Sequence, residues 1–331
     1  MFLKNNFYKN KKVLVAGGTG LVGQQLVKRL INLKSEVYIA SKDNKKLENK
    51  NIKRFYNVDL SQIKNCIKVT KNMDIVFNLL GITGSPKMNI ENPASFMMGN
   101  INLSLPLLEA AKINNIKRYL FTSTYGVYGP SKIMSEDDVW KTFPSEHDKY
   151  AGWAKRIAEL QVEAYKKEYN FKGLNVVRPG NIFGPFGNFN PKNSMVVSSL
   201  IKRVVDGENP LVVWGDGTAI RDFIFSKDVA EGMLQVVKKN IQEPINLGSG
   251  KGYSIKQLVK AICNSRHIKI KPKIIFDKSK PSGDKVRILN VKRAKKYKIY
   301  KITNFQNAID ETIKWYIDNK PKTKLRFNYF K

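Results

Sequence analysis

Three glycines near the start of the chain stand at a spacing that suits phosphate binding. Gly17, Gly20 and Gly23 follow a short apolar run, and an apolar pattern of helical period comes directly after them. Gly17 permits a tight turn, Gly20 lets backbone N–H groups approach a pyrophosphate, and Gly23 lets the helix pack near the strand. The anion then faces the positive end of the helix dipole. This segment is therefore predicted to be a strand, loop and helix that bind a dinucleotide.

Further apolar runs alternate with helical segments along the first half of the chain. Strands are expected at residues 13–16, 36–40, 53–58, 74–80, 117–123 and 173–178, and helices at residues 103–114 and 150–169. This alternation is typical of a parallel sheet that helices cover on both faces. We predict an α/β fold with a Rossmann-type doubly wound parallel sheet, whose ligands lie beyond the carboxyl ends of the strands.

The pattern loosens after residue 178 into loops rich in glycine, proline and asparagine. Short helices follow, with strands expected near residues 211–214, 245–247 and 274–276. We predict a dinucleotide-binding domain over residues 1–178. A smaller C-terminal domain over residues 179–331 is predicted mainly to bind substrate and to interleave with the sheet.

Composition excludes several other classes of function. The cysteines, Cys66 and Cys263, and the histidines, His147 and His267, lack metal-type spacing, so no metal is expected. No signal peptide and no bilayer-length apolar run are recognised, so a reduced cytoplasmic enzyme without membrane attachment is expected. The net charge of +32 attracts anions. Because the lysines are spread along the chain, we expect recruitment of an anionic substrate and no specific binding of nucleic acid.

Two motifs beyond the glycine loop narrow the class of protein. Residues 121–129 read FTSTYGVYG, and residues 178–185 read RPGNIFGP. With the glycine loop, they make the chain resemble the extended short-chain dehydrogenase/reductase family, which modifies nucleotide-activated sugars. The resemblance covers about residues 11–319. It implies a bound nicotinamide cofactor, a nucleotide-diphosphate-sugar substrate and a homodimer.

The end of the second predicted strand bears on the type of cofactor. An acidic residue there selects NAD by accepting hydrogen bonds from the ribose. Here Ser41 and Lys42 occupy the place, with Asp43 one residue late. A hydroxyl and an ammonium suit a 2′-phosphate, which favours NADP over NAD, although Lys42 is equally compatible with a solvated surface charge.

The resemblance implies a set of cofactor contacts that follow the strands. The expected residues are Gly17, Thr19, Gly20, Leu21, Val22, Gly23, Ser41, Lys42, Asp59, Leu60, Leu80, Gly81, Asn100, Thr122, Lys155 and Pro179.

Three residues are candidates for catalysis by the same resemblance: Thr124, Tyr150 and Lys155. Thr124 would hydrogen-bond the reacting sugar oxygen. The family places its tyrosine four residues before the lysine, because residues four apart share a helix face. The lysine lowers the pKa of the tyrosine and grips the nicotinamide ribose, and the tyrosine acts as acid or base.

The tyrosine and the lysine of this chain are five residues apart. A regular helix turns by roughly 500° over five residues, which leaves Tyr150 and Lys155 about 140° apart. Three explanations are open. A π-bulge near Gly152 absorbs the extra residue, or Tyr150 lies on a non-helical lead-in. In the third, Ala151 stands where the tyrosine should be, and proton transfer is altered or absent.

The second half supplies the expected substrate contacts, which the resemblance assigns to Asn181, Asn190, Trp214, Arg221 and Arg287. Arginine suits a diphosphate because its planar fork binds two phosphate oxygens at once.

These residues lead us to expect a nucleotide-diphosphate-sugar epimerase or 4-ketoreductase, nearest to the GDP-fucose synthase and UDP-glucose 4-epimerase types. Gly126 and Met195 stand where the GDP-fucose synthase type has its cysteine and histidine, which disfavours 3,5-epimerisation. Tyr125 and Gly126 replace the acidic pair typical of the family's dehydratases, so dehydration is disfavoured too. The alternatives are a GDP-fucose synthase-like bifunctional enzyme and a cofactor-binding protein with lost or altered catalysis.

Overall fold

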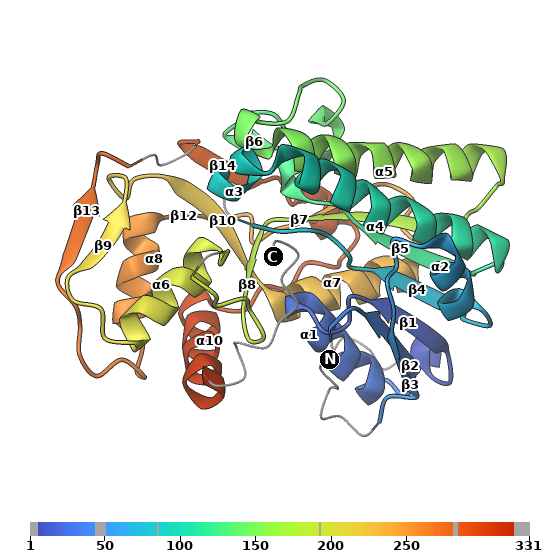
Figure 1. Cartoon of the computed structure of the whole chain (residues 1–331), viewed down its shortest axis with the longest axis horizontal. Coiled ribbons are helices and arrows are strands. Elements are labelled where there is room, and N and C mark those ends of the chain that lie inside the picture. The colour runs from blue at the N-terminus through green and yellow to red at the C-terminus, as the bar shows by residue number, and fades with distance from the viewer. Residues whose placement is uncertain (1–5, 44–50, 85, 192, 281–283, 321–331) are drawn as a thin grey trace.

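The computed structural model describes residues 6–43, 51–84, 86–191, 193–280 and 284–320 (Figure 1). Its strands are β1 (Lys12–Ala16), β2 (Glu36–Ser41), β3 (Arg54–Asn57), β4 (Ile75–Asn78), β5 (Arg118–Thr122), β6 (Ile133–Met134), β7 (Leu174–Pro179), β8 (Asn181–Phe183), β9 (Leu211–Trp214), β10 (Ile220–Phe225), β11 (Ile245–Leu247), β12 (Gly252–Ser254), β13 (Ile274–Asp277) and β14 (Val286–Leu289). Its helices are α1 (Leu21–Asn32), α2 (Ile63–Thr70), α3 (Pro86–Glu91), α4 (Pro93–Ile113), α5 (Lys149–Glu168), α6 (Val196–Val205), α7 (Ser226–Lys239), α8 (Ile255–Cys263), α9 (Lys292–Lys296) and α10 (Phe305–Asn319).

A seven-stranded parallel sheet organises the molecule, in the order β11-β7-β5-β4-β1-β2-β3. Strand β1 lies between β2 and β4, with Val13 in register with both Val37 and Ile75. These apolar strands are buried because helices cover both faces of the sheet. The order of the strands reverses beside β1, which is where such sheets bind ligands. The predicted α/β fold with a Rossmann-type sheet is confirmed.

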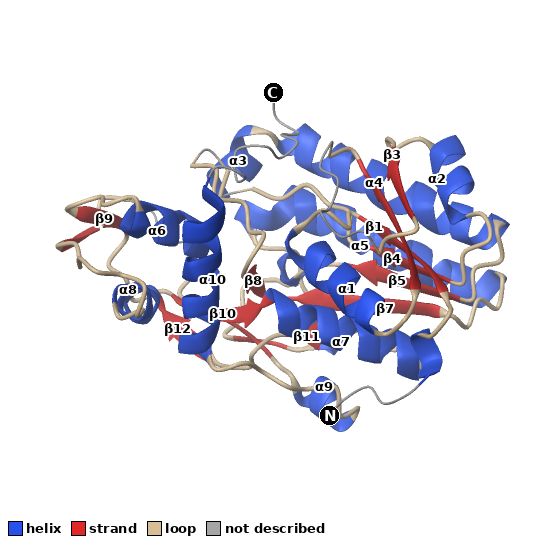
Figure 2. Ribbon diagram, turned by 90° about the horizontal axis from the view of Figure 1, so that it is seen from below, coloured by secondary structure: helices blue, strands red, loops and turns tan. Residues whose placement is uncertain are grey.

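Two helical layers enclose this sheet (Figures 1 and 2). Helices α1 and α7 pack together on one face, where Leu26 and Leu234 belong to the same buried cluster as Val15. Helices α2, α4 and α5 cover the other face, with Leu107 and Val162 in the core. Helix α4 begins at Pro93, well before the predicted residue 103, since proline suits a first helical turn.

A second unit lies beside the carboxyl ends of the main strands (Figure 2). A smaller sheet runs β12-β10-β14-β6, with β8 paired to β10, and β13 pairs with β9. Helices α6, α8 and α10 share a third buried cluster with residues of β9 and β10, such as Val213 and Phe223. In contrast, β11 and α7 come from the second half of the chain but pack into the main sheet and its helical layer.

Candidate active site

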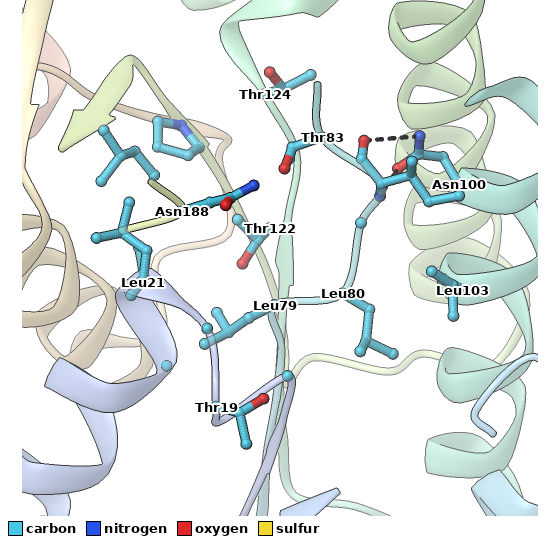
Figure 3. Close-up of a pocket in the computed structure, with 18 of the residues that line it drawn as sticks. Thr19, Leu21, Leu79, Leu80, Thr83, Asn100, Leu103, Thr122, Thr124 and Asn188 are labelled. Carbon is cyan, nitrogen blue, oxygen red and sulfur yellow. Dashed lines mark hydrogen bonds between the residues drawn. The ribbon is translucent and has the colours of Figure 1, made fainter. Parts of the chain in front are cut away.

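One cavity of about 510 Å³ opens where the strands of the main sheet end. Figure 3 shows Thr19 and Thr124 at opposite ends of this cavity, with Leu79 and Leu80 between them. The expected residues that line it are Gly17, Thr19, Gly20, Leu21, Val22, Gly23, Ser41, Lys42, Leu60, Leu80, Gly81, Asn100, Thr122, Thr124, Lys155, Pro179 and Asn181.

The glycine loop has the tight geometry that its spacing predicts. Gly17 has φ of +80°, which favours glycine, and its N–H donates to the Ala40 carbonyl at 2.9 Å. A Cβ on Gly23 would lie 2.3 Å from the Gly17 carbonyl oxygen. Gly20 is the N-cap of α1, so the first N–H groups of the helix face the cavity edge without a side-chain cap. The loop is shaped for an anion at the start of α1.

A polar group stands at the Thr19 end of the cavity. The hydroxyls of Thr19 and Ser41 are 2.8 Å apart, and Lys42 Nζ lies 2.7 Å from Asp59 Oδ2. Burial raises the pKa of Asp59, but hydrogen bonds from Lys42 and Ser61 outweigh it and the pKa is lowered. Asp59 itself is not among the lining residues, but it forms an ion pair with Lys42, which lines the cavity.

Lys155 occupies the centre of the site. Its ammonium donates to the carbonyl oxygens of Leu80 at 2.9 Å and Thr122 at 3.1 Å. Burial lowers its pKa to about 8. A Cβ on Gly81 would lie 3.3 Å from this nitrogen and 3.3 Å from Asn100 Oδ1, so Gly81 leaves the ammonium room. The lysine is thus held by the ends of two neighbouring strands.

Helix α5 resolves the spacing between the tyrosine and Lys155. The helix is α-helical throughout Lys149–Glu168, without a π-bulge, and Tyr150 is its second residue rather than part of a non-helical lead-in. Both of those explanations are therefore wrong. Ala151 lines the cavity one turn before Lys155, whereas Tyr150 does not line it and is 36% exposed. The third explanation, with Ala151 where the tyrosine should be, describes the structure.

A different tyrosine lines the cavity, one that the sequence did not single out as functional. Tyr125 lines the wall next to Thr124, and its hydroxyl donates to Asn181 Oδ1 at 2.8 Å. The Arg287 guanidinium lies 4.4 Å from the centre of its ring. Its position directly after Thr124 is a signal that could have identified it.

The expected substrate residues fall into two groups. Asn181 lines the cavity, and its amide nitrogen donates to the Asp222 carbonyl at 3.1 Å. The other four, Asn190, Trp214, Arg221 and Arg287, are not among the lining residues, and Trp214 is 55% exposed.

The two arginines lie side by side behind Tyr125. Arg221 of β10 is in register with Arg287 of β14 and donates to the Asp284 carbonyl at 2.6 Å. Arg287 is 4% exposed and donates to Asp148 Oδ2 at 2.7 Å, but its Nη2 has no hydrogen-bond partner among the described residues. Since buried donors are normally satisfied, this atom is suited to an anion.

The site fits a nicotinamide dinucleotide. Thr122 Oγ1 is buried at the cavity wall without a hydrogen-bond partner in the described part of the chain. A side chain at Gly23 or Gly81 would fill the space beside the loop and Lys155. No group of metal-binding side chains occurs among the described residues, and none of their helices could cross a membrane.

A parallel sheet, a glycine loop and a central lysine in one cavity define a dinucleotide-binding enzyme fold. Residues 13–248 match the NAD dependent epimerase/dehydratase family, and the chain belongs to this family. The resemblance noted from the sequence is therefore confirmed. The family uses NAD or NADP and acts on nucleotide-sugars.

Individual relatives show how far the likeness extends. The chain is 28% identical to GDP-mannose 3,5-epimerase of Arabidopsis thaliana, over 97% of this chain and 82% of the relative. It is 25% identical to GDP-L-fucose synthase of Escherichia coli, over 94% and 98%. The UDP-glucose 4-epimerase of Thermotoga maritima, solved with UDP-glucose, superposes with a TM-score of 0.79 at 25% identity, covering 92% of this chain and 98% of that one.

Proposed function

We propose that the protein is an epimerase or a 4-ketoreductase of a nucleotide-diphosphate-sugar that prefers NADP to NAD. The observation that carries this proposal is the convergence of the glycine loop, Lys155 and Thr124 on one cavity. A bound nicotinamide supplies or accepts a hydride at the sugar ring. Lys155 would hold its ribose through the ammonium, and Thr124 would orient the sugar oxygen.

The type of reaction within the family depends on which side chains at the site can carry a proton. Gly126 and Met195 cannot, which argues against 3,5-epimerisation despite the similarity to a GDP-mannose 3,5-epimerase. Tyr125 next to Gly126 offers no carboxylate pair, which argues against dehydration. Redox chemistry at a single carbon of the sugar ring remains the best-supported reaction.

The substrate diphosphate would lie toward Asn181, Arg221 and Arg287. The unsatisfied Nη2 of Arg287 supports this assignment because a phosphate oxygen would complete its hydrogen bonding. Asn190 and Trp214 are retained as contacts to the nucleoside part, on the basis of the family resemblance alone.

The preference for NADP is supported by Ser41 and Lys42, which face the same end of the cavity as Thr19. A 2′-phosphate would compete with Asp59 for the Lys42 ammonium.

The test is to incubate the protein with GDP-, UDP- and dTDP-sugars and their 4-keto forms, with each nicotinamide cofactor. Nicotinamide absorbance reports net reduction, and mass spectrometry with chromatography against sugar standards reports epimers. Turnover of at least one nucleotide-sugar is expected. No turnover of any, with cofactor bound, would favour the second candidate, a cofactor-binding protein without catalysis, which the alanine at position 151 motivates.

A homodimer in the cytoplasm is also proposed. Helices α4 and α5 pack against each other, and Met98 of α4 and Leu160 of α5 are exposed apolar side chains. Sedimentation equilibrium should give twice the chain mass, and Leu160→Asp should shift the protein to monomer.

A further inference from the structure

We propose that Tyr125 is the residue that gives a proton to the sugar oxygen, in place of the tyrosine that α5 lacks. This inference rests on the proposed function and deepens it by assigning the acid for the reduction of a sugar ketone. It begins from Ala151, whose methyl side chain lies in the cavity one turn before Lys155 and can carry no proton.

Few side chains of the cavity can exchange a proton. Among the described lining residues, the titratable ones are Lys42, Asp43, Tyr125 and Lys155. Lys42 and Asp43 directly follow Ser41, whose hydroxyl contacts that of Thr19. Figure 3 shows Thr19 and Thr124 at opposite ends of the cavity. Lys155 is engaged with two backbone carbonyls. Tyr125 is therefore the titratable side chain next to Thr124 that is left for the sugar.

The Tyr125 hydroxyl is already oriented toward the substrate side of the cavity. It donates to Asn181 Oδ1 at 2.8 Å, and Asn181 also lines the cavity. A sugar oxygen that takes the place of the Asn181 oxygen would accept the same hydrogen. Tyr125 also follows Thr124 directly, and a short helical turn that Thr124 caps fixes both residues at the end of β5.

The surroundings of Tyr125 keep its phenol protonated until it donates. Burial raises the pKa of Tyr125, Arg287 and Arg221 lower it, and Asp148 and Asp284 raise it, with a raised pKa as the result. The residue is thus a neutral phenol at physiological pH and can donate. His147, which is 3.2 Å from Arg287 Nη1, is a further titratable neighbour of this group. After donation, the phenolate would face the Arg287 guanidinium, 4.4 Å from its ring centre.

Reduction of a ketone needs the acid in its neutral form, and the step would run as follows. The sugar carbonyl carbon accepts a hydride, and the π pair of that carbonyl takes the Tyr125 proton, so a C–H bond and an O–H bond form. The sugar ketone is reduced, and the reduced nicotinamide dinucleotide is the co-reactant that is oxidised. Tyr125 is left as the phenolate and regains its proton from solvent.

The experiment compares Tyr125→Phe with Tyr169→Phe, which removes an exposed hydroxyl near the far end of α5. With the 4-keto nucleotide-sugar that the wild-type protein reduces, Tyr125→Phe should lower kcat by about 100-fold or more, the usual contribution of a positioned acid. Tyr169→Phe should stay within about twofold. The affinity for NADPH, measured by fluorescence, should be unchanged in both variants, which shows that the cavity is intact.

A second readout does not depend on turnover. Calorimetric binding of the same nucleotide-sugar to Tyr125→Phe should weaken by about threefold to tenfold, as expected for one lost hydrogen bond. In the Tyr125→Phe background, Ala151→Tyr should restore kcat by at least about tenfold, because it puts a phenol on the lysine face of α5.

Three outcomes would overturn the inference. Tyr125→Phe retaining wild-type kcat and affinity would remove Tyr125 from the reaction. Loss of kcat on Tyr150→Phe with Tyr125→Phe active would return the role to Tyr150. A wild-type protein that binds cofactor but turns over no nucleotide-sugar would refute the proposed function, and the assignment of Tyr125 with it. The wild-type assay alone distinguishes this outcome from the first two.

Discussion

Ala151 and Lys155 line the same cavity from one face of α5, and Tyr150 lies beyond that face. A helix places residues four apart one above the other, so the position that shares the lysine's surroundings is the alanine. Any proton transfer beside Lys155 must therefore come from outside this helix. This constraint supports the assignment of Tyr125 as the proton donor.

Cofactor binding should depend on pH through Lys155. Its pKa is lowered to about 8 by burial, so the ammonium is present below pH 8 and is lost above it. We expect NADPH affinity to be nearly constant up to about pH 7 and to fall above pH 8, by up to about tenfold per pH unit. Fluorescence titration across pH measures this. Lys155→Met should bind more weakly at pH 7 and show no such fall, and an identical profile in both proteins would contradict the role.

Lys42 should set the preference between the two cofactors. Its ammonium is 2.7 Å from Asp59 and lines the cavity beside Ser41. Charge-assisted hydrogen bonds contribute roughly 1.5–3 kcal/mol, so Lys42→Ala should weaken NADPH binding by at least about tenfold and leave NADH within about twofold. Lys117→Ala removes an exposed charge just before β5, at the amino ends of the strands and so opposite the cavity. It controls for the effect of the protein's overall positive charge on cofactor binding. Equal losses for both cofactors would show that Lys42 does not read the 2′-phosphate.

Gly23→Ala should disrupt the phosphate loop. The added methyl would lie 2.3 Å from the Gly17 carbonyl oxygen and 2.7 Å from Gly18 Cα, so α1 must move. Overpacking of this kind destabilises a protein by roughly 1–3 kcal/mol, and NADPH affinity should fall by at least about tenfold. Denaturant unfolding and fluorescence titration check the two effects. Lys28→Ala, at an exposed position of the same helix, should change neither.

Glu159 should stabilise the fold rather than take part in catalysis. Its carboxylate pairs with Arg178, with 2.6 Å and 3.0 Å contacts, and both side chains are almost fully buried. Removing one partner leaves an uncompensated charge, so Glu159→Ala should lower the free energy of unfolding by roughly 3–5 kcal/mol. Glu163→Ala breaks an exposed pair with Lys167 on the same helix and should cost about 0–1 kcal/mol. Equal effects of the two variants in urea unfolding would refute the distinction.

The sequence by itself determined the sheet, the glycine loop and the family. Apolar runs, their period and the glycine spacing are local properties, and the strands at residues 13–16 and 211–214 follow from them within a residue. The family resemblance placed Lys155, Thr124 and Asn181 in one site, and all three line the same cavity.

Only the tertiary structure decided which residue of α5 lines the cavity beside Lys155 and which side chains pack against Tyr125. Whether Tyr150 or Ala151 faces Lys155 depends on where a regular helix begins and on how it packs, which a spacing of five residues leaves open. The pairing of Arg221 with Arg287, and of Arg287 with Tyr125, joins segments far apart in the chain through strand register. Such contacts arise when distant strands meet, so no local pattern can contain them.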